Sequence, residues 1–242
     1  MSEARARRDS EPAFVLHSYA YRETSLLVEM FCRHRGRVGM VARGARRPRS
    51  AMRGVLMAFQ PLEISWSGKS ELKTLHAAEW RGGIAQLRGK SLICGFYLNE
   101  LLLRLLARED PHEHLYQHYG EAVRALSVGV EESLPAVLRQ FEKALLKELG
   151  YALILDRDGD GAHIDPHARY EYRVDRGPQR LPSDNAGPIE LLGKTLLDLA
   201  CDNYSDPVTL HQGRQLMRQI IGYHLGRQSL HTRQLMMELQ QP

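Results

Sequence analysis

Cysteine is scarce in this 242-residue chain, which has only Cys32, Cys94 and Cys201, far apart and without a CxxC pair. This spacing excludes a disulfide scaffold and a cysteine-based zinc site, and it is typical of a protein in a reducing compartment. Long hydrophobic runs are absent too, because polar and charged residues interrupt the most apolar window, residues 91–106. The charged N-terminal segment lacks the apolar stretch of a secretory signal. We therefore expect a soluble cytoplasmic protein with no membrane partner.

Catalytic motifs are also missing: the chain has no Walker-type loop, no GxGxxG, no GxSxG and no persuasive pair of carboxylates. Residues 156–161 match the first half of a calcium loop, but His167 stands where a bidentate glutamate is needed, which favours an acidic turn. Two histidine groups are incomplete as metal-ligand sets: His163 with Asp165 and His167, and His114 with His118. We predict no catalytic residue, no metal and no cofactor. The alternative from another class is a metal-dependent nuclease that uses the loop Asp156–Asp160.

Positive charge is concentrated in the first third of the chain. Residues 1–81 hold 15 Lys and Arg against 8 Asp and Glu, whereas residues 82–242 hold 18 against 21. Residues 36–53 begin as an alternating strand, contain no acidic residue, and end in a loop with Arg43, Arg46, Arg47, Arg49 and Arg53. Because guanidinium groups repel one another, this cluster favours a polyanionic partner, of which nucleic acid is the commonest. A solvated loop without any partner is the alternative.

The hydrophobic period divides the chain into a β part and a helical part. Period-two patterning predicts strands near residues 13–18, 24–32, 37–43, 59–66 and 71–79. Five short strands favour a small barrel, with the OB-fold ahead of an SH3-like barrel, and Pro61 suggests an edge position or a bulge. Helices are expected at residues 91–107, 112–127, 134–149, 189–203, 207–225 and 231–240, with an irregular excursion at 151–188 that contains a strand near 170–174. The expected class is α+β, with an OB-fold DNA-binding domain at 1–81 and a helical domain at 82–242.

The loops of the predicted barrel carry aromatic and basic side chains. In OB-folds the ligand usually lies across strands 2 and 3, between the loops that join strands 1–2 and strands 4–5. The first of these loops holds Tyr19, Tyr21 and Arg22, and the second holds Lys69, with Lys73 on the following strand. Rings beside cations suit base stacking and phosphate neutralisation. Alternatively, the two tyrosines cover the barrel core. The polar arm at residues 1–11 is expected to be frayed and could add charge to the same surface.

A series of short segments then resembles one family, in the same order along nearly the whole chain. The segments are Phe14–His17, Arg22–Ser25, Gly36–Val38, Val41–Arg46, Pro61–Leu62, Leu72–Leu75, Tyr97–Leu101, Arg139–Glu142, Leu149–Tyr151 and, more weakly, Leu230–Leu235. Together they resemble the RecO family of bacterial recombination mediators. The resemblance implies an N-terminal OB-fold followed by a helical domain. It also implies a non-enzymatic protein that binds single- and double-stranded DNA, anneals complementary strands, and helps load RecA onto DNA coated by single-strand-binding protein.

The resemblance further implies partners and residues for binding them. The implied partners are RecR and the C-terminal tail of the single-strand-binding protein, and the location is the cytoplasm at the nucleoid. The DNA surface maps onto Arg22, Arg37, Arg43, Arg46, Arg47, Arg49, Arg53 and Lys73, beside Tyr19 and Tyr21, and the tail contact onto Arg139, Leu138 and Phe141. Many family members carry a four-cysteine zinc site where this chain has residues 151–188 without cysteine, so zinc is expected to be absent. The alternative is an adaptor recruited through the helical domain, with only secondary DNA contact.

Overall fold

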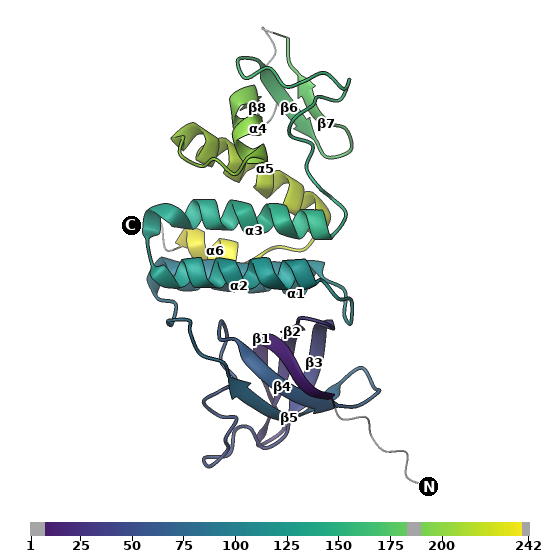
Figure 1. Ribbon diagram of the computed structural model, residues 1–242, viewed down its shortest axis with the longest axis vertical. Coiled ribbons are helices and arrows are strands. Elements are labelled where there is room, and N and C mark those ends of the chain that lie inside the picture. The colour runs from purple at the N-terminus through teal and green to yellow at the C-terminus, as the bar shows by residue number, and fades with distance from the viewer. Residues whose placement is uncertain (1–7, 183–189, 239–242) are drawn as a thin grey trace. The chain divides into compact units, whose positions relative to one another are not determined.

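The computed structural model describes residues 8–182 and 190–238, so most of the N-terminal arm lies outside the described residues. Two compact units are present: Met1–Gly129 together with Leu230–Pro242, and Val130–Ser229. The division predicted at residue 81 falls inside the first unit, because helices after that residue pack with the barrel. The elements are shown in Figure 1.

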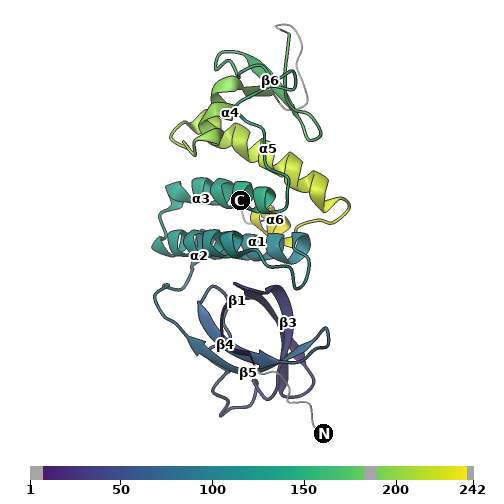
Figure 2. The ribbon, with the colours of Figure 1, turned by 45° about the vertical axis from the view of Figure 1, so that its right-hand side comes forward.

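Five strands close into a barrel in the first unit (Figures 1 and 2). They are β1 (Arg8–Tyr21), β2 (Ser25–Cys32), β3 (Gly36–Ala42), β4 (Leu62–Ser67) and β5 (Lys73–Trp80). The order around the barrel is β1-β2-β3-β5-β4, and only the β3–β5 pairing is parallel among these strands. This is the OB-fold, as the sequence predicted. The expected strand 59–66 begins later, at Leu62.

Pro61 lies in neither of the settings that the sequence suggested, an edge strand or a bulge within the strand. It lies just before β4, in a barrel that is closed, and its carbonyl accepts a hydrogen bond from the backbone N–H of Arg81 at 2.9 Å. Proline lacks an N–H for the ladder, and this position outside the strand requires none. The irregularity of β4 lies further along, where the register with β5 shifts between Ser65 and Trp66.

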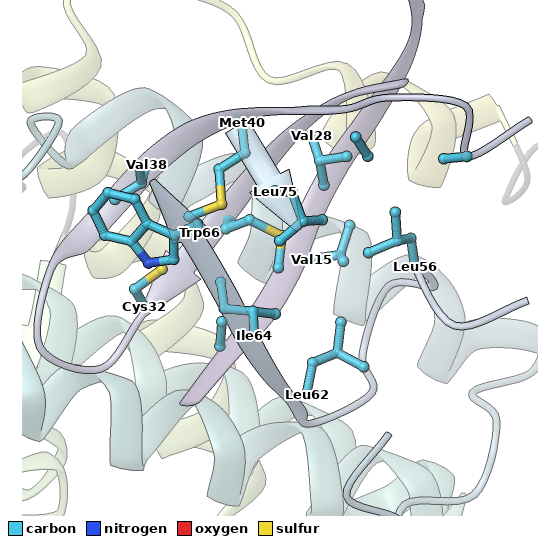
Figure 3. Packing of buried hydrophobic residues seen from close by; sticks show 14 residues of the cluster. Val15, Val28, Cys32, Val38, Met40, Leu56, Leu62, Ile64, Trp66 and Leu75 are labelled. Carbon is cyan, nitrogen blue, oxygen red and sulfur yellow. The ribbon is translucent and has the colours of Figure 1, made fainter. Parts of the chain in front are cut away.

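The barrel interior is filled by alternate residues of each strand, as a period of two requires. Figure 3 shows Val28 of β2, Met40 of β3, and Ile64 and Trp66 of β4 converging on Leu75 of β5. The intervening residues of β2, such as Phe31, point outward and yet are buried. The outer face of this part of the barrel is therefore covered as well.

Helices α1 (Gly89–Leu105) and α2 (Glu113–Val128) provide that cover within the first unit, and α6 (His231–Glu238) packs against α1. The side chain of Asn99 on α1 donates to the carbonyl of Leu16 on β1 at 2.8 Å and accepts from the hydroxyl of Tyr119 on α2 at 2.6 Å. Phe31 packs against the ring of Tyr119, with their centroids 6.0 Å apart. Asn99 thus fixes both helices against the strand that they cover.

The second unit combines helices with a three-stranded sheet in the order β7-β6-β8. Its elements are η1 (Glu131–Ser133), α3 (Leu134–Glu148), β6 (Arg169–Arg173), β7 (Gly177–Arg180), β8 (Glu190–Leu192), α4 (Gly193–Ala200) and α5 (Pro207–Leu225). The helix predicted at 189–203 was wrong at its start, because Glu190–Leu192 pair with β6 and the helix begins only at Gly193. The expected strand near 170–174 is confirmed as β6. Among the described residues, no helix is long and apolar enough to cross a membrane.

Candidate nucleic-acid interface

Residues 43–56, between β3 and β4, form a compact segment that we call the arginine loop. It folds as a succession of tight turns, in which Arg47 donates its N–H to Gly44, Ser50 to Arg47, and Arg53 to Ser50, at 3.0 to 3.1 Å. Gly44 begins the series with a φ of +69°, a conformation that a side chain would strain. Local hydrogen bonds therefore hold the loop in shape.

Apolar residues anchor the arginine loop to the barrel. Ala45 and Leu56 belong to the buried barrel core, and Met52 and Val55 pack against it. With these side chains turned inward, the arginines are left on the outside, and the exposed ones are Arg43, Arg46, Arg47, Arg49 and Arg53. The loop thus presents its cations to solvent by alternating them with core residues.

The arginine loop is tied to the turn between β1 and β2. The backbone N–H of Arg46 donates to the carbonyl of Thr24 at 2.9 Å, and its Nη1 donates to the carbonyls of Glu23 at 3.3 Å and Arg22 at 3.5 Å. Arg22 is exposed, and its guanidinium lies 5.2 Å from the ring centroid of Tyr21. Two predicted ligand-binding segments, far apart in sequence, are therefore brought together.

Tyr19 does not cover the barrel core. Its side chain is exposed, and its ring packs against the imidazole of His17 with centroids 4.3 Å apart. Tyr21, at the end of β1, is half-buried beside Arg22. Tyr19 and Tyr21 therefore lie at the same end of β1 as the basic turn. The ring of Tyr19 is exposed and that of Tyr21 is half-buried, so both are at least partly accessible for further contact.

Carboxylates of the described residues leave the exposed arginines of this surface without countercharge. Within residues 8–182 and 190–238, no carboxylate forms an ion pair with Arg22, Arg43, Arg46, Arg47, Arg49 or Arg53. Other arginines of the same unit do have partners, for example Arg33 with Glu113 at 3.5 Å and Arg81 with Glu63 at 3.2 Å. A polyanion would supply the countercharge that the described carboxylates do not provide to the loop.

Two of the predicted DNA-binding cations lie elsewhere, already neutralised by carboxylates. Arg37 is only 18% exposed in its side chain and lies 3.5 Å from Glu29, and its burial lowers the pKa of its guanidinium. Lys73 is 6% exposed and lies 2.7 Å from Glu109. The expectation that both present free charge to DNA is therefore corrected: their ion pairs would have to break first.

The barrel face across β2 and β3, where an OB-fold ligand usually lies, is largely closed. Arg108, from the segment between α1 and α2, contacts Glu29 on β2 and also pairs with Glu71 at 2.7 Å. Phe31, further along β2, lies under α2. Sequence reasoning missed Arg108, although a charged residue at a strand position such as Glu29 signals that a cation must cover it. The accessible basic surface is consequently the arginine loop with the β1–β2 turn.

The predicted tail contact on α3 is also less accessible than expected. Arg139 is buried, and its Nη2 lies 2.6 Å from Oε1 of Glu142, one turn later on the same helix and buried as well. Phe141 is buried, and Leu138 is half-buried. We expected the guanidinium of Arg139 to bind a carboxylate of the partner's tail, but in the structure it binds the carboxylate of Glu142 instead.

The carboxylates of the incomplete metal-ligand sets hold local turns. Asp158 accepts the backbone N–H of Asp160 at 3.0 Å and of Ala162 at 2.9 Å, which confirms the acidic turn. Asp165 accepts the N–H of His167 and lies 3.2 Å from Arg180. Across the described ranges, no group of three or more His, Cys, Asp and Glu side chains is placed to hold a metal ion.

Both halves of the chain match models of known protein families. Residues 7–84 match the family model "Recombination protein O N terminal", and residues 86–234 match "Recombination protein O C terminal". A protein of Nitrosospira multiformis named "DNA repair protein RecO" is 53% identical over 245 residues, covering 100% of both chains. The protein of the same name from Dechloromonas aromatica is 51% identical over 238 residues, covering 98% of both chains.

Proposed function

The chain belongs to the RecO family of DNA repair proteins, and from this membership and its arginine loop we propose that it binds single- and double-stranded DNA and anneals complementary strands. Family membership by itself supports a role in DNA repair and recombination. The observation that carries the finer proposal is the set of exposed arginines at one end of the barrel that pair with no carboxylate in the described part of the chain. We propose that the protein acts there without covalent catalysis.

The proposed mechanism is electrostatic. Two complementary strands repel each other through their phosphates, and the arginine loop lowers this repulsion when its guanidinium groups bind the backbone of one strand. Base pairing then supplies the free energy of annealing. Because guanidinium groups that contact phosphates do not read base edges, affinity should depend little on sequence. Tyr19 and Tyr21 would add stacking with unpaired bases beside Arg22.

We further propose that this chain helps load RecA onto DNA coated by single-strand-binding protein, with RecR as partner. Such work would place the protein at the nucleoid. A tail contact at Leu138, Arg139 and Phe141 would require Arg139 to exchange Glu142 for the carboxylate of the tail. An adaptor role with secondary DNA contact is the competing proposal, and it predicts annealing that does not depend on the arginine loop.

The test compares two triple variants with equal loss of charge. R43Q/R47Q/R49Q removes three exposed arginines without ion pairs, whereas R157Q/R173Q/R176Q removes three exposed arginines that are paired with Asp156, Glu171 and Asp175. Binding and annealing of labelled oligonucleotides are measured as a function of salt concentration. For four to six phosphate contacts, the wild-type slope of log K against log salt should be roughly −3 to −4 with single strands.

The loop variant should bind all sequences more weakly and lose roughly 2 units of salt slope, while the control keeps the wild-type slope. An affinity that does not change with salt would overturn the electrostatic mechanism. Equal losses in the two variants would show that net charge, rather than the arginine loop, determines binding. Wild-type annealing by the loop variant would favour the adaptor.

A further inference from the structure

A second acid-free stretch lies near the end of the chain. Between Asp206 and Glu238 there is no aspartate or glutamate, and this interval contains Arg214, Arg218, Arg227 and Arg233. Most of it is helix α5, on which Arg214 and Arg218 lie one turn apart and are both exposed. Since surface helices commonly mix charges of both signs, the composition of α5 is unusual for a helix with only a structural role.

Ion pairing within the second unit separates these arginines from the other cations. In its described residues, 130–182 and 190–229, most lysines and arginines lie within 4.0 Å of a carboxylate, as Lys143 does with Asp202. Those that form no such pair are Lys147, Arg214, Arg218 and Arg227, and all are exposed. Lys147 and Arg227 lie near helix C-termini, where a cation is favourable. Arg214 and Arg218 have no such compensation.

Aromatic rings gather at the C-terminal end of the same helix. The ring of Tyr151 stacks on His224 with centroids 3.9 Å apart and an interplanar angle of 24°, and Tyr223 meets His224 edge-on at 5.4 Å. Tyr151 is 49% exposed and Tyr223 is 66% exposed, although large rings normally gain free energy when they are buried. Burial lowers the pKa of His224, so its ring is neutral at neutral pH and stacks as an aromatic.

The backbone fixes the position of this cluster. Helix α3 ends at Glu148, and Gly150 follows with a φ of +83°. There the N–H of Tyr151 donates to the carbonyl of Leu146 at 2.8 Å and that of Gly150 to the carbonyl of Lys147 at 3.0 Å. These two bonds form a Schellman motif, which sets the direction in which the chain leaves the helix. This turn therefore places Tyr151 at the C-terminal end of α5, and the exposed rings are preorganised.

We propose that Tyr151 and Tyr223, with Arg214 and Arg218 of α5, form a second contact for single-stranded DNA, in which the rings stack on unpaired bases and the arginines neutralise the backbone. This inference rests on the proposed function and deepens it, since it assigns a strand-selective contact to the helical unit. Exposed aromatic rings beside cations are the features that proteins use to bind single strands. A duplex keeps its bases stacked internally, so the contact selects unpaired strands. An acidic peptide would also meet the arginines, but stacked, exposed rings favour a planar partner.

The test measures binding of fluorescein-labelled oligo-dT and of a duplex of the same length to the full chain. Y223A should weaken binding of oligo-dT by roughly tenfold and leave duplex affinity unchanged, because only unpaired bases lose a stacking partner. Y223F, which keeps the ring, should bind oligo-dT as the wild type does. R218Q should reduce the salt slope for oligo-dT by about 1. Irradiation of an oligonucleotide that contains 5-iodouracil should crosslink to Tyr223 or Tyr151.

Several outcomes would overturn the inference. Wild-type binding of oligo-dT by Y223A, without crosslinks to Tyr151 or Tyr223, would remove the contact. Equal weakening for oligo-dT and duplex would show that bases are not stacked there. A defect confined to DNA coated by single-strand-binding protein would assign the surface to a peptide. The proposed arginine-loop site can fail separately: if R43Q/R47Q/R49Q binds normally while Y223A does not, the loop proposal falls and this one stands.

Discussion

The guanidinium of Arg46 donates to the main-chain carbonyl of Glu23, 3.3 Å away, and so fastens the arginine loop to the turn between β1 and β2. Its neighbours Arg47 and Arg49 are exposed, and within residues 8–182 and 190–238 their side chains make no comparable hydrogen bond. Arg46 therefore braces the loop, whereas Arg47 and Arg49 remain exposed. This difference allows the stability of the loop to be separated from its charge.

We expect R46A to lower both the free energy of unfolding and the affinity for DNA, because it removes a brace and a charge together. The loss of stability should be about 0.5–1 kcal/mol, the usual net value of a hydrogen bond at the surface. R49A should lower affinity by a similar factor without changing stability. R46K, which keeps the charge but loses the planar fork, should lose stability and retain most of the affinity. Urea unfolding and fluorescence anisotropy measure the two effects, and equal stability of R46A and R49A would contradict the brace.

Arg37 is expected to act in folding rather than in DNA binding. R37M would leave the buried carboxylate of Glu29 with Arg108 as its remaining cation, and should lower the free energy of unfolding by about 1–3 kcal/mol. R37M combined with E29L should recover part of this loss, because the uncompensated charge is removed as well. The salt slope of DNA binding should stay at the wild-type value in R37M. A stable R37M protein with a reduced slope would instead place Arg37 on the DNA surface.

The sequence was sufficient for the barrel, since inward and outward residues alternate along each strand and the loops carry their own turn signals. It also predicted the exposed arginine loop, because no acidic residue lies nearby to pair with it. It was insufficient for Arg37 and Lys73, whose burial depends on carboxylates brought close only by the fold, Glu109 among them. For Arg139 a local signal existed: Glu142 follows by three residues, the spacing at which helical side chains meet. Similarly, β8 forms by pairing with a strand about twenty residues earlier, which outweighs local helical preference.

The buried pair on α3 should be sensitive to the loss of either member. R139M leaves Glu142 buried without its cation, and should lower the free energy of unfolding by about 3–5 kcal/mol. The double variant R139M/E142L should lose far less, because an apolar pair of similar volume replaces the ions. Chemical denaturation of the wild type, both single variants and the double variant gives the coupling between the two residues. Additive effects would show that the pair has no energetic role, and would make Arg139 available to an external carboxylate.

The last prediction concerns Glu100 on α1, which holds the N-terminus of α6. Its carboxylate accepts the backbone N–H of His231 at 2.8 Å and, on its other oxygen, the N–H and hydroxyl of Thr232 at 2.9 and 2.6 Å. Burial raises the pKa of Glu100, but the hydrogen bonds from Thr232 and His231 outweigh that effect, so the pKa lies below its ordinary value. The carboxylate thus serves as the N-cap of a helix that comes 131 residues later.

The direction of this pKa shift determines how stability changes with pH. Because the folded pKa is lowered, Glu100 contributes its full stabilisation above the ordinary glutamate pKa of about 4.3 and loses it as the pH falls through the folded value. The difference in free energy of unfolding between wild type and E100Q should therefore be largest near neutral pH and shrink below about pH 4. T232V, which removes only the hydroxyl donor, should show a smaller difference with the same pH trend. Hydrogen exchange at the amides of His231 and Thr232 locates the effect: faster exchange in E100Q at neutral pH is expected, and unchanged exchange would show that α6 is held by its apolar contacts alone.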